Sequence, residues 1–357
     1  MTQKYKIVNI KTSSGPKEEA SILIIYTGGT LGMVYDNEGA LIPFNFSQIK
    51  QQIPLLKDHD LGITVISFPQ PLDSSNVSSA HWADIGYIVY QNYRQYDGFV
   101  ILHGTDTMAY TASALSFMLE GLNKPVILTG AQLPIGAMRS DARENLFTSI
   151  EIASAKKDGH PKICEVCIFF DNHLLRGNRA KKVRSSEFSA FASENHPPLA
   201  TAGIKINYNY PHMKRPYQKD FSLNLKDKFD NNVAVLKLFP NISEALVKSI
   251  LTTKGLKGVV METYGSGNAP TEKWFYKALE KAISSKIIVM NVSQCIGGNV
   301  IQGRYETSKQ LQAVGVLSGR DITMEAAITK MMLLLGEEKD HEAIKAMLIT
   351  PLAGEMA

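Results

Sequence analysis

Short apolar runs alternate along the chain with longer stretches whose apolar residues recur at helical spacing. The apolar runs in the first half occupy 21–26, 62–68, 98–103 and 124–130, with a further run around 163–170. The amphipathic stretches between them occupy 82–96, 107–122 and 142–157. Short, continuously apolar strands separated by helices predict a parallel sheet that is buried on both faces.

The alternation breaks down from about residue 203, where the sequence is rich in tyrosine, proline and charge, and resumes with apolar runs at 232–240, 255–262 and 285–294. A chain of 357 residues also exceeds what one hydrophobic core usually organises. We therefore expect four segments: a flexible leader at 1–20, an N-terminal α/β domain at 21–210, a linker at 211–231 and a smaller C-terminal α/β domain at 232–357.

Composition narrows the function classes. The formal net charge is +4 and the basic residues are scattered, so no patch demands nucleic acid or an anionic membrane. No segment approaches the roughly 18 apolar residues of a membrane span. The first twenty residues are polar and lack the apolar core of a signal peptide. We expect a cytoplasmic protein.

Three cysteines are present, and Cys164 and Cys167 have the spacing of a redox or zinc motif. They lie in an apolar run that reads as a buried strand, where a spacing of three sends side chains to opposite faces. There is no second cysteine pair to complete a zinc site. A structural role is favoured over metal or redox chemistry.

The loops that follow the predicted strands carry the chemistry, because ligands bind beyond the carboxyl ends of parallel strands. Four such loops, rich in hydroxyl and carboxylate side chains, are expected at 27–32, 69–76, 103–108 and 131–145. The glycine pattern of the first loop is GGxxG, without the GxGxxG order or the acidic residue about 20 positions on that a dinucleotide loop needs.

Each loop taken alone has a simpler interpretation, as a tight turn, a helix cap or a solvated helix start. Four of them at strand ends fit one polar pocket better. With no metal cluster and no G-x-S-x-G motif, the remaining nucleophile is a hydroxyl, which needs a base to activate it. A lysine in the basic run 179–184 is a candidate base, although a surface salt bridge is the usual role of such a lysine.

Two of these segments match a known family. The sequences YTGGTLGM at 26–33 and HGTDTMAYTA at 103–112 resemble the two signatures of the bacterial-type L-asparaginases, and the second is highly specific. LTGAQLP at 128–134 and RGNR at 176–179 resemble the cytoplasmic (type I) branch. The resemblance extends from about residue 21 to the end of the chain.

The resemblance implies catalytic roles for Thr30, Thr105, Asp106 and Lys182. Thr30 matches the threonine that attacks the substrate amide carbon, and the other three match the family's second catalytic group. Lys182 is preferred to Lys181 because it stands six residues after Arg176, which is the family's spacing. The implied substrate is L-asparagine, and no metal or organic cofactor is expected.

The resemblance also implies the substrate-binding residues, which are Gly29, Asp73, Ser74, Ser75, Gly104 and Ala131. The loop 73–75 would hold the substrate α-carboxylate and α-amino groups, and Asp106 would pair with the α-ammonium. Backbone N–H groups near Gly29 and Thr105 would form the oxyanion hole, and the Ala131 carbonyl would face the leaving amide.

The fold implied is α/β, with a larger flavodoxin-like N-terminal domain and a smaller Rossmann-like C-terminal domain, assembled as a homodimer or a dimer of dimers. The loop 31–44 would be a lid hinged at Gly32 and Gly39. Two positions depart from the family. Ala40 stands where the type I branch has a tyrosine, with Tyr35 nearby, and Glu262 stands where some members have an allosteric arginine.

Three related functions are alternatives. A mixed glutaminase-asparaginase would differ by one methylene in the pocket, which shifts selectivity only ~10- to 200-fold. An amidotransferase component for tRNA-dependent synthesis would have a long extension before the first signature, whereas only 26 residues precede Thr27 here. A non-catalytic asparagine sensor would not need both hydroxyls and the lysine.

Overall fold

The computed structural model describes residues 5–11, 19–35, 41–43, 60–216, 222–303 and 306–357. The chain forms two compact units, one of 1–192 with 197–225 and one of 193–196 with 226–357. The chain passes from one unit to the other between Leu225 and Lys226, within the segment expected to be a linker. In the described part of the chain, no helix has the length and apolarity to cross a membrane.

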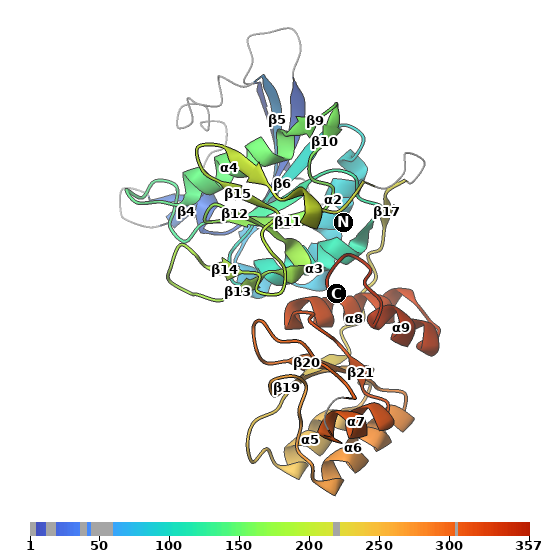
Figure 1. The fold of residues 1–357 in the computed structure, drawn as a ribbon. Coiled ribbons are helices and arrows are strands. Elements are labelled where there is room, and N and C mark those ends of the chain that lie inside the picture. Colours follow the sequence, from blue (N-terminus) through green and yellow to red (C-terminus); the bar gives the residue numbers. More distant parts are fainter. Residues whose placement is uncertain (1–4, 12–18, 36–40, 44–59, 217–221, 304–305) are drawn as a thin grey trace. The chain divides into compact units, whose positions relative to one another are not determined.

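The centre of the first unit is a block of five parallel strands (Figure 1). In spatial order they are β5 (Leu61–Leu72), β2 (Ala20–Gly28), β6 (Gly98–Leu102), β8 (Val126–Thr129) and β11 (Val166–Phe170). The second strand in sequence thus lies outside the first, and the later strands follow on its other side. This is the flavodoxin-like order, 2-1-3-4-5, and it confirms the predicted fold class.

Antiparallel strands extend this block at both edges. β1 (Lys6–Lys11) pairs with β5, and β12 (His173–Arg176), β15 (Ala200–Ala202) and β16 (Ile206–Tyr208) follow β11 at the other edge. Residues 6–11 therefore form a strand within the segment expected to be a flexible leader. The sheet is mixed at its edges, where the sequence indicated only parallel strands.

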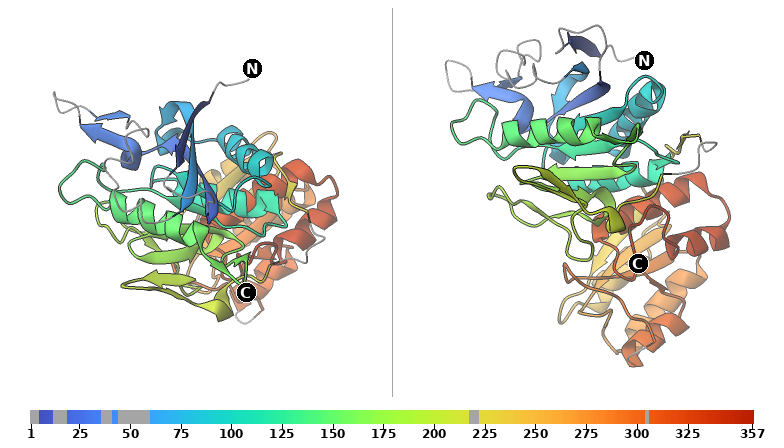
Figure 2. Two further views of the ribbon diagram at one scale, coloured as in Figure 1. Left: turned by 90° about the horizontal axis from the view of Figure 1, so that it is seen from above. Right: turned by 45° about the horizontal axis from the view of Figure 1, so that its top comes forward.

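Helices cover both faces of the sheet. They are α2 (Ser79–Asn92), α3 (Met108–Met118) and α4 (Ala142–Ser154). Ile22 and Ile24 of β2 share a buried cluster with Leu146 and Ile150 of α4. Figure 2 shows α4 and α2 on opposite sides of the sheet. Burial on both faces explains why the central strands are continuously apolar.

Short elements complete the first unit. They are η1 (Thr30–Gly32), β3 (Met33–Tyr35), β4 (Leu41–Pro43), η4 (Ser74–Asn76), β7 (Leu119–Glu120), β9 (Lys156–Lys157), β10 (His160–Pro161), η5 (Gly177–Arg179), β13 (Lys181–Lys182), β14 (Phe191–Ala192), η6 (Tyr210–His212) and β17 (Asn224–Leu225). β17 and all but the first residue of η6 lie in the segment expected to be a linker, where β17 pairs with β7.

The second unit has one four-stranded parallel sheet. Its strands follow chain order and are β18 (Val233–Lys237), β19 (Gly258–Thr263), β20 (Ile288–Ser293) and β21 (Leu317–Ser318). Its helices are α5 (Glu244–Leu251), α6 (Lys273–Ser284), α7 (Glu306–Ala313), α8 (Met324–Glu337) and α9 (His341–Leu348). Figure 1 shows α5, α6 and α7 on one side of this sheet and α8 on the other, the predicted α/β arrangement.

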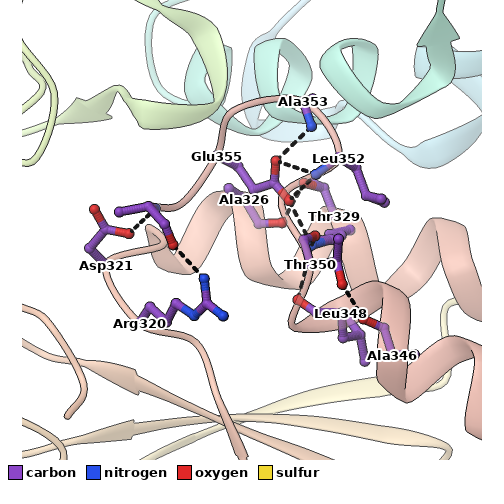
Figure 3. Close-up of polar contacts among 12 residues, drawn as sticks. Arg320, Asp321, Ala326, Thr329, Ala346, Leu348, Thr350, Leu352, Ala353 and Glu355 are labelled. Atoms are coloured by element: carbon purple, nitrogen blue, oxygen red, sulfur yellow. Dashed lines mark hydrogen bonds and ion pairs between the residues drawn. The ribbon is translucent and has the colours of Figure 1, made fainter.

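A buried ion pair fixes the last residues of the chain to α8. Lys330 Nζ lies 2.6 Å from Glu355 Oε1, and both side chains are fully buried. The ammonium also donates to the carbonyls of Leu348 and Thr350 at 2.9 and 2.7 Å. Glu355 accepts from the N–H groups of Leu352 and Ala353 (Figure 3). Every charge of the pair is thus hydrogen-bonded, as burial of charge requires.

The three cysteines are free thiols. Cys164 and Cys167 are buried and Cys295 is exposed. Burial raises the pKa of Cys164 to about 11 and that of Cys167 well above its ordinary value, so neither is a thiolate at neutral pH. Among the described residues, no group of three His, Cys, Asp or Glu side chains is placed to hold a metal ion.

Candidate active site

Three of the predicted loops pack directly on one another through glycines. Gly29 has φ of 86°, and a Cβ there would lie 2.6 Å from the backbone nitrogen of Gly104. A Cβ on Gly130 would lie 2.5 Å from the carbonyl oxygen of His103. Only glycine permits this backbone-on-backbone contact. The ends of β2, β6 and β8 therefore converge, as expected for strand ends at one edge of a parallel sheet.

Thr30 is half-buried and begins η1, one residue after the Gly29 contact. The turn is fixed by Tyr26, whose hydroxyl donates to the carbonyl of Gly32 at 3.0 Å. A Cβ on Gly32 would strike the Tyr26 ring. Burial raises the pKa of Tyr26 to about 12, so this phenol is a hydrogen-bond donor and not a base.

The second predicted catalytic group is assembled in the structure. Lys182 Nζ, on β13, lies 2.8 Å from Thr105 Oγ1 and 2.7 Å from Asp106 Oδ1. The lysine side chain is 15% exposed and that of Asp106 is 67% exposed. The lysine is thus shielded while the carboxylate faces solvent. A neutral amine at this position could accept the proton of the Thr105 hydroxyl, because the two atoms are within hydrogen-bond reach.

The predicted substrate-binding loop lies at the end of β5. Asp73 caps η4 by accepting from the N–H of Ser75 at 3.0 Å, and hydrogen bonds from Ser75 lower its pKa. Asp73 and Ser75 are exposed, whereas Ser74 is buried. The Ser74 carbonyl accepts from the Thr107 hydroxyl at 2.7 Å, and the Ser74 side chain packs over Gly104. The loop after β5 is thereby joined to the loop after β6.

The loop after β8 is held by the start of α4. Asp141 accepts from the N–H groups of Gln132 and Leu133 at 3.0–3.1 Å, and Asn145 donates to the Gly130 carbonyl at 3.0 Å. Ala131, between these contacts, is buried. Its backbone is therefore fixed on both sides, which suits a carbonyl that must orient a substrate amide.

Several side chains at the site received no role from the sequence. Gln132 Oε1 lies 3.5 Å from Thr105 Oγ1, and its amide donates to the carbonyls of Ser185 and Glu187 at 3.2 and 2.8 Å. His103 lies immediately behind the loop and is 1% exposed. The signal for His103 was its position directly after a buried strand. Its contact with Thr111, eight residues on, and the bond from Trp82 to Thr111 could not be read from the sequence.

Other predicted positions fall outside this cluster. Ala40 and Gly39 lie outside the described residues, and so does much of the expected lid at 31–44. Glu262 belongs to the second unit, where its buried carboxylate lies 3.6 Å from Lys237 Nζ.

Comparison with known proteins identifies the family of the chain. The family model for the N-terminal domain of asparaginases matches residues 21–214. The family model for the C-terminal domain of glutaminases and asparaginases matches residues 232–348. The chain belongs to the asparaginase family. The family-level resemblance seen in the sequence is therefore confirmed.

Similar proteins include an asparaginase, a lysophospholipase and an amidotransferase component. Escherichia coli K12 L-asparaginase 1 is 40% identical over 95% of this chain and 98% of its own length. The human 60 kDa lysophospholipase is 40% identical over 95% of this chain, which spans only 62% of that protein. A glutamyl-tRNA(Gln) amidotransferase component of Pyrococcus abyssi is 33% identical, over 94% of this chain and 76% of its own length.

Solved asparaginase structures have the same fold. L-asparaginase I from Vibrio cholerae superposes with a TM-score of 0.85 at 38% identity, covering 95% of this chain and 99% of its own. The thermostable L-asparaginase from Thermococcus kodakarensis gives 0.84 at 31% identity, covering 94% and 99%.

Proposed function

We propose that this protein is an L-asparaginase, which hydrolyses the side-chain amide of L-asparagine to L-aspartate and ammonia with a threonine nucleophile and no metal or organic cofactor. One observation carries the proposal. Lys182 Nζ reaches both Thr105 and Asp106 in a loop that packs on the glycine preceding Thr30. These contacts bring a shielded lysine and an exposed carboxylate to the Thr105 hydroxyl, and they support a shared role with the neighbouring Thr30.

The chemistry follows from these positions. Thr30 attacks the amide carbon, and backbone N–H groups near Gly29 and Thr105 stabilise the oxyanion. Each preorganised donor of this kind contributes a factor of ~100 to ~1000 in rate. The proton released by Thr30 passes to the departing nitrogen, which leaves as ammonia. Water then hydrolyses the ester of Thr30, which releases L-aspartate and restores the hydroxyl. Lys182, when neutral, takes the proton of the Thr105 hydroxyl and makes that oxygen a base toward the nucleophile or the water.

Substrate recognition uses the charged groups of an amino acid. Asp106 is exposed beside Lys182, and we assign it the α-ammonium of asparagine. The segment 73–75 presents short hydrogen-bonding groups, to which we assign the α-carboxylate and α-amino groups. The carbonyl of Ala131 accepts from the leaving amide. A pocket that must satisfy both charged groups and a short amide selects a small amino acid.

We also propose a cytoplasmic homo-oligomer, a dimer or a dimer of dimers, that needs neither nucleic acid nor a membrane. The support is the family resemblance and the scattered charge. Light scattering coupled to size-exclusion chromatography measures the mass of the particle directly. A monomer with full activity would contradict the expected assembly.

The direct test is ammonia release from L-asparagine and L-glutamine by the wild type and Thr30→Ala. We expect rapid release from asparagine, slow release from glutamine, and a loss of several orders of magnitude in Thr30→Ala, because this variant lacks the proposed nucleophile. Thr253→Ala, which removes an exposed hydroxyl of the second unit bonded to the Ser249 carbonyl, is the matched control.

The outcomes separate the alternatives. Equal rates with both amides would indicate a mixed glutaminase-asparaginase. Release from glutamine that depends on glutamyl-tRNA would indicate the amidotransferase function of the Pyrococcus relative. If neither amide is cleaved but asparagine raises the melting temperature, the protein is a binding protein and not an enzyme.

A further inference from the structure

A buried histidine behind the candidate active site is not used by the proposed chemistry. His103 is the last residue before the Gly104–Asp106 loop, and its ring lies between Gly104 and helix α3. Trp82 on α2 and Thr111 on α3 complete the group, and all three side chains are buried. None of the three is accessible to a substrate, so any effect they have must pass through the loop.

The three side chains form a hydrogen-bond chain that ends on the backbone of Gly104. Trp82 Nε1 lies 3.0 Å from Thr111 Oγ1, which lies 2.9 Å from His103 Nε2. His103 Nδ1 lies 2.7 Å from the Gly104 carbonyl oxygen. This last contact is between adjacent residues and is the shortest of the three.

The two ends of the chain determine its direction. An indole N–H can only donate and a carbonyl can only accept. Trp82 therefore donates to the Thr111 hydroxyl, and Nδ1–H donates to the carbonyl of Gly104. In a neutral ring Nε2 then has no proton, so Thr111 donates to it. This arrangement requires a neutral imidazole with its proton on Nδ1. Burial lowers the pKa of His103 to about 4, although the bond to Gly104 opposes this shift, so the ring is neutral at physiological pH.

Holding the Gly104 carbonyl also fixes the next N–H group. A trans peptide is planar, so the N–H of Thr105 points away from the side on which the Gly104 carbonyl is held. Gly104 has no side chain to restrict rotation of this peptide, and Ser74 fills the space where a side chain would be. Without the bond from His103, rotation at a glycine would be easy.

We propose that Trp82, Thr111 and His103 position the Gly104–Thr105 peptide so that the Thr105 N–H faces the reacting carbonyl and its hydroxyl faces Lys182. This inference rests on the proposed amidohydrolase function. In it, His103 is a positioning residue that neither gives nor takes a proton in the reaction. Through these hydrogen bonds, helices α2 and α3 determine the geometry of the oxyanion hole without contacting the substrate.

The first test removes one hydroxyl from the chain. Thr111→Val has nearly the same shape but cannot donate to His103, whereas Thr111→Ser keeps the donor. We expect Thr111→Val to lower kcat about 10- to 100-fold with KM within about threefold, because a displaced donor loses part of its ~100- to ~1000-fold contribution. Thr111→Ser should keep most of the wild-type kcat.

A matched control separates positioning from stability. Thr329 of the second unit is fully buried and donates to the Glu325 carbonyl, so Thr329→Val is the same chemical change away from the site. We expect it to lower the melting temperature without changing kcat. If Thr111→Val also lowers only the melting temperature, with kcat unchanged, the proposal is wrong.

A second readout does not need activity. Nitrogen-15 NMR of the histidine ring, assigned by its loss in His103→Gln, should show a neutral Nδ1–H ring from pH 5 to 8 in the wild type and a changed signal in Thr111→Val. An Nε2–H ring, or titration near pH 6.5, would overturn the proposal. If the wild type releases no ammonia, the proposed function fails, while a crystal structure of Thr111→Val still shows whether the Gly104 peptide has turned.

Discussion

At the scale of single residues, Lys182 occupies an unusual position. Its side chain is only 15% exposed, yet one of its two partners is a neutral hydroxyl and the other is a mostly exposed carboxylate. A lysine held only for charge pairing gains little from such a shielded site, because exposed pairs contribute only a little stability. We expect the contact with Thr105, rather than the ion pair with Asp106, to be the one that the proposed reaction uses.

Replacing Lys182 by arginine tests whether the residue must lose a proton. Arg keeps the positive charge toward Asp106, but its guanidinium cannot be deprotonated in a protein. We expect Lys182→Arg to lower kcat by a factor of ~100 to ~10000, the usual contribution of a general base. The measurement is ammonia release at saturating asparagine.

Lys181→Arg is the control for Lys182→Arg, since it makes the same substitution at the adjacent residue. We expect near wild-type activity from it and similar melting temperatures for both variants. A Lys182→Arg enzyme with more than a tenth of the wild-type kcat would show that the residue acts as a cation and not as a base.

The contact between Lys182 and Thr105 also marks the limit of what residue patterns predict. The two residues are far apart in sequence, and no periodicity relates positions at that separation. Only the family resemblance indicated that they would meet. The role of His103 could not be read in the same way, because the direction of its hydrogen bonds depends on Trp82 and Thr111, which come from two different helices.

At the scale of secondary-structure elements, burial decided which strands the sequence could predict. β2, β6, β8 and β11 are buried on both faces, and each appeared as a continuous apolar run. β1 was missed because only one of its faces is buried: Ile7 is exposed while Ile10 is buried. Its alternating pattern lies within a short polar segment and resembles a leader. The edge strands β15 and β16 are short and carry mixed polarity, so they gave no signal.

Strands β19 and β20 of the second unit bear on whether asparagine could regulate the protein at a second site. The segment that could carry an allosteric asparagine site lies at the ends of β19 and β20. Glu262 there is buried and faces Lys237, and the Thr263 hydroxyl donates to Asn291 Oδ1 at 2.6 Å. The Ser293 hydroxyl donates to the Gly265 carbonyl at 2.6 Å. The polar groups are thus bonded within the unit, and a carboxylate occupies the place of an arginine.

We predict that asparagine does not activate this protein through that segment. A second carboxylate close to Glu262 would be repelled by about 4 kcal/mol at 4 Å and an effective dielectric constant of 20. Initial rates should therefore follow a hyperbola in asparagine concentration, with a Hill coefficient near 1. A sigmoidal curve that becomes hyperbolic in Thr263→Val or Ser293→Ala would contradict this prediction.

At the scale of the whole molecule, the last residues of the expected C-terminal domain are held by buried side chains rather than by secondary structure. Residues 349–357 form no helix or strand, yet Ala353, Glu355 and Met356 are buried. The Arg320 guanidinium donates to the Ala357 carbonyl at 2.6 Å, and the Ala357 N–H donates to Asp321 at 2.8 Å (Figure 3). The sequence did not indicate that Lys330 and Glu355, 25 positions apart, form an ion pair. Buried charges are rare, and tertiary structure determines their partners.

Glu355→Gln should reveal how much this segment stabilises the second unit. The change leaves the buried ammonium of Lys330 without its counter-ion, which typically costs about 3–5 kcal/mol. Glutamine can still accept from the backbone N–H groups, so the loss reports on the charge. Lys330→Met combined with Glu355→Gln removes the unpaired charge and should recover part of the stability. Glu342→Gln, at an exposed pair with Lys345, should leave the melting temperature nearly unchanged.

The same pair predicts how stability depends on pH. Burial alone would raise the pKa of Glu355, but the nearby Lys330 ammonium and the hydrogen bonds to the carboxylate outweigh it and hold the pKa below its ordinary value of 4.5. The folded state therefore binds this proton less readily than the unfolded state, and the stabilisation is complete above pH 4.5 and lost as the pH falls through the lowered pKa. Melting temperatures of the wild type and Glu355→Gln should differ most near pH 7 and converge in acid. A difference that stays constant down to pH 3 would show that the ion pair does not control the attachment of the C-terminal segment.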